Sequence, residues 1–190
     1  MAKPNYSFEK RQKEIAKKKK KEEEFRIEDL VLSKLKTGFM VDYDMKTYIV
    51  AAYNKYQWDE GGVTDEWELK SGNEIWYLER TQEDGEVEWS LCRKLPISEL
   101  QGDIAGEIVR NEDPPEVVTF QGKQFSFEED NVGEFFKGGS GEALSFVAWD
   151  YEDEAEEQFL TIEQWGETKF DIQVGFKVEE YQFTNILPGE

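Results

Sequence analysis

The chain has 190 residues, enough for one compact domain or two small ones, and its thirteen Phe, eight Tyr and six Trp can fill a core. It contains no histidine and a single cysteine, Cys92. This composition excludes catalytic triads and dyads built on histidine, zinc sites built on imidazole or thiolates, and an internal disulfide. Enzymatic chemistry would have to use carboxylates, lysines, tyrosines or a hard cation bound by oxygen atoms, and we expect no cofactor.

Charge is divided unevenly along the chain. Residues 1–24 hold nine Lys or Arg and five Glu, a net charge of +4, whereas residues 25–190 hold 14 basic and 38 acidic residues, a net charge of −24. The acidic body repels nucleic acid and anionic lipid, so we do not expect it to bind either of them. The simplest interpretation of the acidity is solubility, and mimicry of a nucleic acid is the alternative.

Neither a membrane-spanning segment nor a secretion signal is expected. No apolar run approaches the roughly 18 to 20 residues that a transmembrane helix requires. The N-terminus lacks the basic, apolar and small-residue regions that follow one another in a signal peptide. The sequence therefore predicts a cytoplasmic location.

The first part of the chain predicts a charged α-helix. Residues 7–24 are rich in helix formers, contain no Gly or Pro, and begin at Ser7, which can serve as the N-cap. They carry too few apolar side chains to pack on a core, so we expect residues 1–24 to be a helical or disordered extension in solvent. A lysine run in this extension predicts a solvated tail or, alternatively, a binding site for an anionic surface; its members are Lys17, Lys18, Lys19, Lys20 and Lys21.

After Gly38 the hydrophobic pattern has the two-residue period of β-strands, interrupted by Gly, Asp and Asn turn signals. The clearest case is residues 170–178, where apolar and polar or small residues alternate strictly, as in a half-buried strand. The first series of predicted strands is 39–43, 47–58, 66–70, 74–80 and 86–93, and the second is 117–120, 124–128, 143–151, 157–165 and 169–178.

These two series define the predicted halves of the body, residues 25–96 and residues 117–190. Residues 97–116 contain the Asp113-Pro114-Pro115 break and few large apolar side chains, which predicts a linker. We expect residues 25–190 to form one compact unit.

The two halves are similar in sequence. Residues 75–79 align with residues 159–163, and the glycine-led segment 85–91 aligns with 166–172. The similarity predicts an antiparallel β-barrel or sandwich-like body made of two related meander halves. The alternative is that any two hairpins share such a pattern.

Candidate catalytic residues follow from this alignment. Glu79 and Glu163 occupy equivalent strand ends. Two carboxylates across a cleft can perform general acid-base catalysis if burial raises the pKa of one of them. The simpler interpretation is that both are strand-end charges that face solvent or satisfy turn amides.

The tryptophans and the longest acidic run give further candidates. Buried rings in the core are the simplest interpretation of the tryptophans, and an aromatic groove formed by Trp58, Trp67, Trp149 and Trp165 is the alternative. Residues 150–157 offer many carboxylates but lack the spacing of a calcium loop, so we predict no metal site there.

A group of segments spread over the body carries a further resemblance: Leu35–Gly38, Thr47–Val50, Asp65–Leu69, Trp76–Glu79, Leu160–Trp165 and Gly175–Val178. Together they resemble a known family, the bacterial domain of unknown function 4178. The resemblance covers about residues 30 to 188 and leaves the lysine-rich extension outside. It implies a β-barrel-like body with a non-catalytic role, and an association with bacterial envelope or stress-response systems.

Three functional hypotheses remain open at this point. The first is a non-catalytic accessory module that binds a protein partner, with the lysine run available for an anionic surface. The second is a hydrolase that depends on carboxylates or magnesium. The third is an acidic mimic of nucleic acid.

Overall fold

The computed structural model describes residues 10–13 and 30–189. Residues 10–13 are helical, and the rest of the predicted N-terminal helix, including Lys17–Lys21, lies outside the described residues. None of the helices in the described ranges combines the length and the apolar character of a membrane-spanning helix. The body is mainly β, as the sequence predicts.

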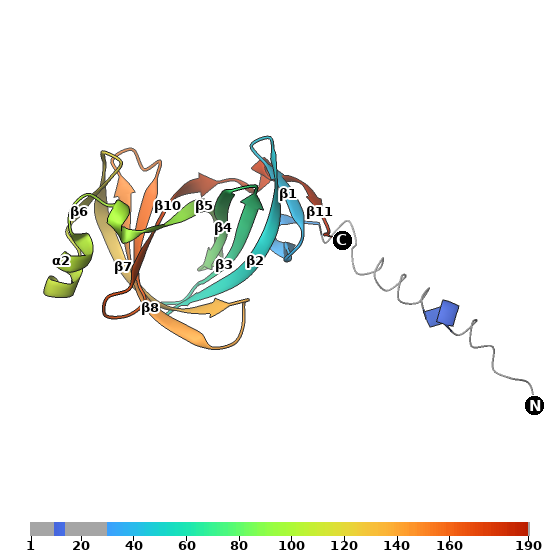
Figure 1. Ribbon diagram of the computed structural model, residues 1–190, viewed down its shortest axis with the longest axis horizontal. Helices are drawn as coiled ribbons and strands as arrows, with labels where there is room; N and C mark the ends of the chain where they lie inside the picture. Colours follow the sequence, from blue (N-terminus) through green and yellow to red (C-terminus); the bar gives the residue numbers. More distant parts are fainter. Residues whose placement is uncertain (1–9, 14–29, 190) are drawn as a thin grey trace, which may run out of the picture.

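Eleven strands of the described chain form one antiparallel sheet (Figure 1). The first five strands are β1 (Met40–Tyr43), β2 (Lys46–Trp58), β3 (Val63–Ser71), β4 (Glu74–Glu83) and β5 (Glu86–Pro96). The other six are β6 (Val117–Phe120), β7 (Lys123–Lys137), β8 (Ala143–Asp153), β9 (Phe159–Gln164), β10 (Phe170–Val178) and β11 (Thr184–Leu187). Four short helices accompany them: η2 (Leu32–Lys34), η3 (Ile97–Glu99), α2 (Ile104–Asn111) and η4 (Glu180–Gln182).

The hydrogen bonding of the sheet closes into a ring. Neighbouring strands run in the order β11-β1-β2-β3-β4-β5-β10-β9-β8-β7-β6, and an additional pairing joins β2 to β7. This pairing aligns residues 54–58 with residues 133–137. Eight strands, from β2 round to β7, therefore form a closed circuit, with β1, β11 and β6 outside it.

Two hydrophobic cores lie toward opposite ends of the molecule. One contains Trp67, Leu78 and Leu91 and is covered by η2 and β1. The other contains Ile162 and Ile172 and is covered by α2 and β6. Figure 1 shows β1 and β11 at one end and α2 and β6 at the other. A smaller aromatic cluster around Tyr56 and Phe146 packs near the β2–β7 seam.

The first five strands and the next five share their register. β1 and β6 have four residues each and lead through a tight turn into β2 and β7. A register shift follows between Val50 and Ala52 in β2, and between Phe127 and Glu129 in β7. Corresponding positions in the two strands are 77 residues apart, as are the first residues, Lys46 and Lys123. The sequence alignment of residues 75–79 with 159–163 fits the observed pairings of β4 and β9.

Residues 97–116, predicted as a linker, contain η3 and α2. α2 begins after the N-cap Asp103, whose side chain accepts a hydrogen bond from the Gly106 amide, and ends at Glu112 in the left-handed region. Ile104 and Ile108 lie one turn apart on its buried face and enter the second core. The few apolar residues of this segment are enough to pack α2 on the second core, because they fall on one side of the helix.

The predicted strands differ from the observed ones in two places. The predicted strand 124–128 continues as β7 to Lys137, because Glu128, Glu129 and Asp130 are exposed on a strand that stays paired with β8. β11 was missed, because its four residues are mostly exposed and pair only with β1. The remaining strand ends differ by a few residues, the usual uncertainty of element boundaries.

Replacement of Ile108 tests whether α2 belongs to the core. Ile108 is 2% exposed whereas its neighbour Val109 is 51% exposed. We expect Ile108→Ala to lower the free energy of unfolding by about 2 to 5 kcal/mol, because it leaves a cavity. Val109→Ala is the matched control and should change it by less than about 0.5 kcal/mol. Urea denaturation measures both, and equal effects of the two variants would show that α2 does not pack on the core.

Candidate functional site

The inner face of the ring is polar. Side chains alternate between the two faces of each strand, and Leu78 of β4 and Leu91 of β5 face the first core. Their neighbours Glu79 and Ser90 are paired across the two strands and face the other way. On β3, Trp67 faces the core and Glu66, opposite Glu79, does not. The closed ring therefore encloses polar side chains between the two cores.

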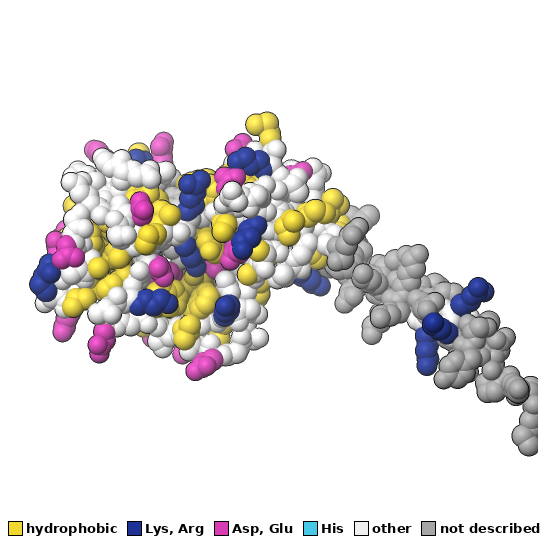
Figure 2. Space-filling model, in the orientation of Figure 1, with side chains coloured by type: hydrophobic (Ala, Val, Ile, Leu, Met, Phe, Trp, Pro, Cys, Tyr) yellow, Lys and Arg dark blue, Asp and Glu magenta, His cyan; other side chains and the backbone are white. Residues whose placement is uncertain are grey.

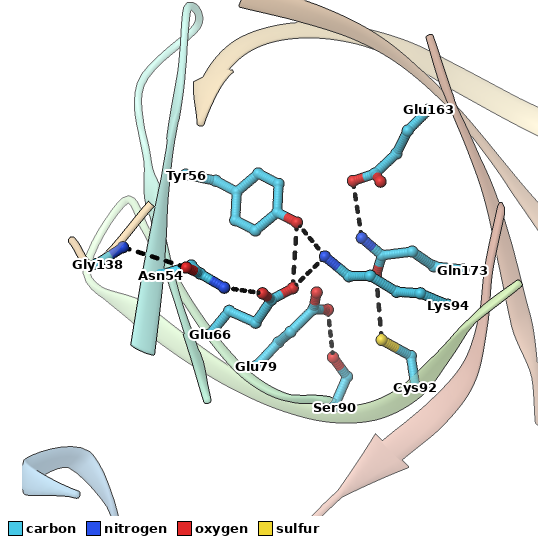
Figure 3. Close-up of polar contacts among 10 residues, drawn as sticks. All are labelled: Asn54, Tyr56, Glu66, Glu79, Ser90, Cys92, Lys94, Gly138, Glu163 and Gln173. Carbon is cyan, nitrogen blue, oxygen red and sulfur yellow. Dashed lines mark hydrogen bonds and ion pairs between the residues drawn. The ribbon is translucent and has the colours of Figure 1, made fainter. Parts of the chain in front are cut away.

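Glu66 is the most deeply buried of these charges, with an exposed fraction of 0%. One carboxylate oxygen, Oε1, accepts a hydrogen bond from Asn54 Nδ2 at 2.8 Å. The other, Oε2, lies 2.5 Å from Lys94 Nζ and accepts a hydrogen bond from the Tyr56 hydroxyl at 3.1 Å. Asn54 in turn accepts a hydrogen bond from the Gly138 amide at 3.2 Å. Both oxygens of Glu66 are thus fully used (Figure 3).

Lys94 supplies the positive charge that balances Glu66. Its ammonium also donates to the Tyr56 hydroxyl at 2.5 Å and lies over the rings of Tyr77, Tyr56 and Phe135, 4.8, 5.2 and 5.8 Å from their centroids. Burial opposes the charge, but the carboxylates Glu66, Glu163 and Glu79 outweigh it and raise the pKa of Lys94 above its ordinary value. Lys94 is therefore a permanent cation and not a nucleophile.

Glu79 and Glu163 approach this ion pair from β4 and β9. Burial and the charge of Glu66 raise the pKa of Glu79 to about 8, against the opposing effects of Lys94 and of the hydrogen bond from Ser90. Burial likewise raises the pKa of Glu163 to about 7, with Lys94 acting in the opposite direction. Near neutral pH the two groups hold protons that ordinary glutamates release. Figure 3 shows both carboxyl groups pointing toward Lys94 and Gln173.

Gln173 links Glu163 to the cysteine. Its side-chain amide donates to Glu163 Oε1 at 2.7 Å, and its oxygen accepts from Cys92 Sγ at 3.1 Å. Cys92 is fully buried, which raises the pKa of its thiol well above the ordinary value. We define the polar cluster as Asn54, Tyr56, Glu66, Glu79, Ser90, Cys92, Lys94, Glu163 and Gln173.

A cleft of about 390 Å³ leads from the surface to the polar cluster. Its inner part is lined by Tyr56, Glu79, Ser90, Glu163 and Gln173, and Trp58, Tyr151 and Phe159 contribute aromatic rings. We call this space the ring cleft. Carboxylates outnumber cations in its lining, where Lys177 is the sole lysine and is paired with Glu88 at 2.7 Å. The further acidic side chains that line it are Glu60, Glu83, Glu128, Glu129, Asp150 and Glu152.

A second hollow, of about 790 Å³, lies beside η2 and is lined by apolar side chains such as Leu35, Phe39 and Trp67. Its one carboxylate, Asp65, already accepts a hydrogen bond from Tyr53 and pairs with Arg80. The ring cleft, in contrast, reaches titratable groups with raised pKa values, and such groups are typical of functional sites. We therefore take the ring cleft as the candidate site.

The structure brings Glu79 and Glu163 to the same cleft, although one comes from each half of the chain. The four tryptophans of the predicted groove do not come together. Trp67 and Trp149 belong to the two separate cores, and Trp58 and Trp165 to the small aromatic cluster. Of the four, only Trp58 lines the ring cleft.

The acidic run 150–157 has a structural role at Asp153. This carboxylate pairs with Lys123 at 2.7 Å and accepts hydrogen bonds from the amides of Glu157 and Gln158. Within residues 10–13 and 30–189 no group of three or more side chains is arranged to hold a metal ion. Asp150, which lines the ring cleft, accepts hydrogen bonds from Thr161 and Asn131.

Sequence reasoning missed Tyr56, Glu66, Lys94 and Gln173. Glu66 on β3 and Gln173 on β10 each alternate with core residues, which is the pattern of a strand with one solvent-facing side. Gln173 is 5% exposed because the second face of β10 lies inside the ring. No pattern within a single strand distinguishes a polar interior from solvent. The only available signal was the internal similarity, which paired Glu79 with Glu163.

Comparison with known proteins identifies a family but names no activity. Residues 36–180 match the model of a family described as Domain of unknown function (DUF4178). An uncharacterized protein of Aquifex aeolicus (strain VF5) is 26% identical over 172 residues, which cover 88% of this chain and 93% of the relative. No solved structure matches the chain.

The raised pKa values of Glu79 and Glu163 predict how stability depends on pH. Unfolded glutamates have a pKa of about 4.3, so between about pH 4.5 and pH 8 the native state keeps protons that the unfolded state releases. The contribution of the two groups is fully present below the unfolded pKa and is lost as pH rises through about 7 for Glu163 and about 8 for Glu79. We expect the free energy of unfolding to fall over this range.

Urea denaturation at a series of pH values measures this slope. Glu163→Gln should make it shallower, because the amide mimics the protonated carboxyl group and does not titrate. Glu167→Gln, at an exposed turn residue, is the matched control and should leave the slope unchanged. A Glu163→Gln profile parallel to that of the wild-type chain would contradict the assignment.

Proposed function

The chain belongs to the DUF4178 family, and we propose that it is a non-catalytic β-rich binding module whose ligand occupies the ring cleft. The observation that carries the proposal is a cleft of about 390 Å³ that ends on the polar cluster. Small-molecule sites have volumes of about 300 to 1,000 Å³ and combine apolar walls with a few fixed polar groups. Trp58, Tyr151 and Phe159 supply such walls here, and Glu79 and Glu163 supply the polar groups.

The polar cluster is held rigidly enough to serve as a preformed site. Glu66 and Lys94 join β3 to β5, the two strands on either side of β4, and Asn54 connects them to the backbone of Gly138 beyond β7. Side chains fixed by such bonds lose little further freedom when a ligand binds. All fully buried side-chain polar atoms of the described residues have partners, so the polar atoms left for a ligand are those that reach the cleft.

We also infer that the ring consists of two related meander halves. The shared register of β1–β5 and β6–β10 supports this inference. Under this correspondence Glu79 of the first half matches Glu163 of the second, while Glu66 and Lys94 match Ala148 and Gly175. The halves thus contribute equivalent carboxylates, and only the first half contributes an ion pair.

A hydrolase that uses the paired carboxylates is the second candidate. It is favoured by one observation, that Glu79 and Glu163 line the same cleft and both have raised pKa values. A protonated carboxyl group can act as a general acid and its partner as a general base. This candidate requires turnover of a substrate such as a nitrophenyl glycoside, and loss of that turnover in both Glu79→Gln and Glu163→Gln. If such a substrate binds but is not hydrolysed, the result supports the non-catalytic binding module.

The proposal extends to partners and location on the strength of the sequence. We propose a cytoplasmic accessory role with a protein partner, linked to the envelope or to stress responses as the family resemblance implies. The lysine run Lys17–Lys21 would contact an anionic surface, since its charge is opposite to that of the body. Figure 2 shows both Asp or Glu and Lys or Arg side chains on the visible face of the body, and only Lys and Arg charges on the described residues 10–13.

Occupation of the ring cleft can be detected through Trp58, whose indole nitrogen donates to Thr64 at 3.0 Å. We expect fragments that bind the cleft to shift the NMR signal of the Trp58 indole group. Trp76, whose indole nitrogen donates to Glu74 at 3.1 Å and which does not line the cleft, is the internal control. A fragment library that moves no Trp58 signal, or moves the Trp76 signal instead, would argue against the cleft as the binding site.

The anionic-surface proposal predicts salt-sensitive binding to lipid vesicles. The full chain should co-sediment with vesicles that contain phosphatidylserine, and replacement of Lys17–Lys21 by Gln should reduce the bound fraction, because each lysine contributes about 1 kcal/mol near such a surface. Neutral phosphatidylcholine vesicles are the control. Equal sedimentation of the two proteins, or binding that does not weaken with salt, would remove the lysine run from the proposal.

A further inference from the structure

Two carboxyl oxygens in the ring cleft lack a protein partner. Glu163 is 2% exposed, and its Oε1 accepts a hydrogen bond from Gln173. Glu79 uses Oε2 to accept a hydrogen bond from Ser90. Among the described residues no hydrogen bond or ion pair reaches Oε2 of Glu163 or Oε1 of Glu79. Both side chains line the cleft, and no fully buried polar atom of the described residues lacks a partner, so these two oxygens are open to the cleft rather than enclosed in the packed core.

The arrangement of these oxygens selects the kind of cation that fits. Each carboxyl group offers one oxygen, since Ser90 and Gln173 occupy the others. A guanidinium prefers both oxygens of one carboxylate, in a bidentate pair. An ammonium group is a compact charge with three donors that can point to separate oxygens. One oxygen from β4 and one from β9 therefore suit an ammonium better than a guanidinium.

The chain already holds one ammonium group beside a carboxylate in this region. Lys94 Nζ lies between Glu66 and three aromatic rings, and Glu66 alone compensates its charge closely. The charge of Lys94 opposes a second cation, but Glu79 and Glu163 are two further carboxyl groups without a cation of their own. The acidic residues along the cleft add a long-range attraction for cations.

From these observations we propose that the ring cleft binds a primary ammonium group between Glu79 Oε1 and Glu163 Oε2, and releases protons when it does. This inference rests on the proposed binding function and specifies its ligand as a small aliphatic amine. The alkyl part of such a ligand would pack on Trp58 and Phe159, which line the same cleft.

Proton release follows from the state of the empty cleft. Glu79 and Glu163 hold protons near neutral pH, whereas an ammonium group requires them ionised. An aliphatic amine keeps its charge up to about pH 10, so affinity should increase with pH between about pH 6 and pH 8.5. The charged groups that face this position are Glu66 on β3, Lys94 on β5, Asp150 on β8, Asp171 and Lys177 on β10, and Glu129 on β7.

Calorimetric titration of the full chain with 1,4-diaminobutane tests the proposal, with 1,4-butanediol as the uncharged control. We expect the diamine to bind more tightly as pH rises and the diol not to bind. In buffers of different ionisation enthalpy the observed heat should differ, which reveals the released protons. The ammonium group could belong to a free amine or to a lysine side chain of a partner, and Nα-acetyl-lysine amide distinguishes these two sources. If it binds as tightly as the diamine, the ligand is a lysine side chain of a partner.

Two variants and one control locate the site. Glu163→Gln and Glu79→Gln should each weaken diamine binding by about tenfold or more, the usual effect of removing a charged hydrogen-bond partner. Glu167→Gln removes the same charge from an exposed turn and should change affinity by less than about twofold. An unchanged Trp76 indole signal verifies that each variant is folded.

Several results would overturn the inference. Equal binding of diol and diamine, affinity that does not depend on pH, or Glu163→Gln and Glu79→Gln variants that bind like the wild-type chain would each exclude an ammonium between these carboxylates. If neither amine binds but other fragments shift Trp58, the binding function stands and the ammonium inference fails. If no fragment shifts Trp58, both fail.

Discussion

The pairing of β2 with β7 determines the environment of every charge in the candidate site. Without it the eleven strands would form an open sheet, and the inner faces of β3, β4 and β5 would meet solvent. With it, residues 54–58 and 133–137 bring the two ends of the circuit together, and Glu66 becomes completely buried. A carboxylate in that position must be paired, because an isolated charge away from water is very costly. Lys94 and Asn54 supply the pairing.

The burial of this ion pair shapes the chemistry of its neighbours. Glu66 and Lys94 neutralise each other, so Glu79 and Glu163 approach the pair without a cation of their own and hold protons near neutral pH. The same field keeps the Lys94 ammonium charged. The proton affinity of Glu79 and Glu163 and their attraction for a cation are thereby linked, because a proton and a cation compete for the same carboxyl groups. Under the proposed binding function, such a site would discriminate ligands by charge, and its occupation would depend on pH.

The two-core organisation explains how a polar interior is tolerated. Each core buries one face of the sheet at one end of the molecule, with Trp67 and Leu78 in the first and Ile162 and Ile172 in the second. Stability therefore comes from the outer packing of β1, η2, β6 and α2 on the sheet. The space between the cores is free to hold groups that contribute to recognition rather than to stability.

The family match covers the part of the chain that forms the ring. The family match covers residues 36–180, which contain the complete eight-stranded circuit and both flanking strands β1 and β6. The lysine run Lys17–Lys21 lies outside the match. Charge and the family match thus both set the lysine run apart from the body.

The sequence alone determined ten of the eleven strands of the described chain, their boundaries to within a few residues in most cases, and the sequence similarity between residues 75–91 and 159–172. These follow from local alternation, which depends on the chemistry of neighbouring residues. It also paired Glu79 with Glu163 through their equivalent positions. Tertiary structure alone decided that the polar faces point into a ring, that α2 joins the second core, and that Glu66 and Lys94 meet. The reason is that a strand with one polar face is identical in pattern whether that face meets water or an enclosed cleft, and only the closure by β2 and β7 distinguishes the two.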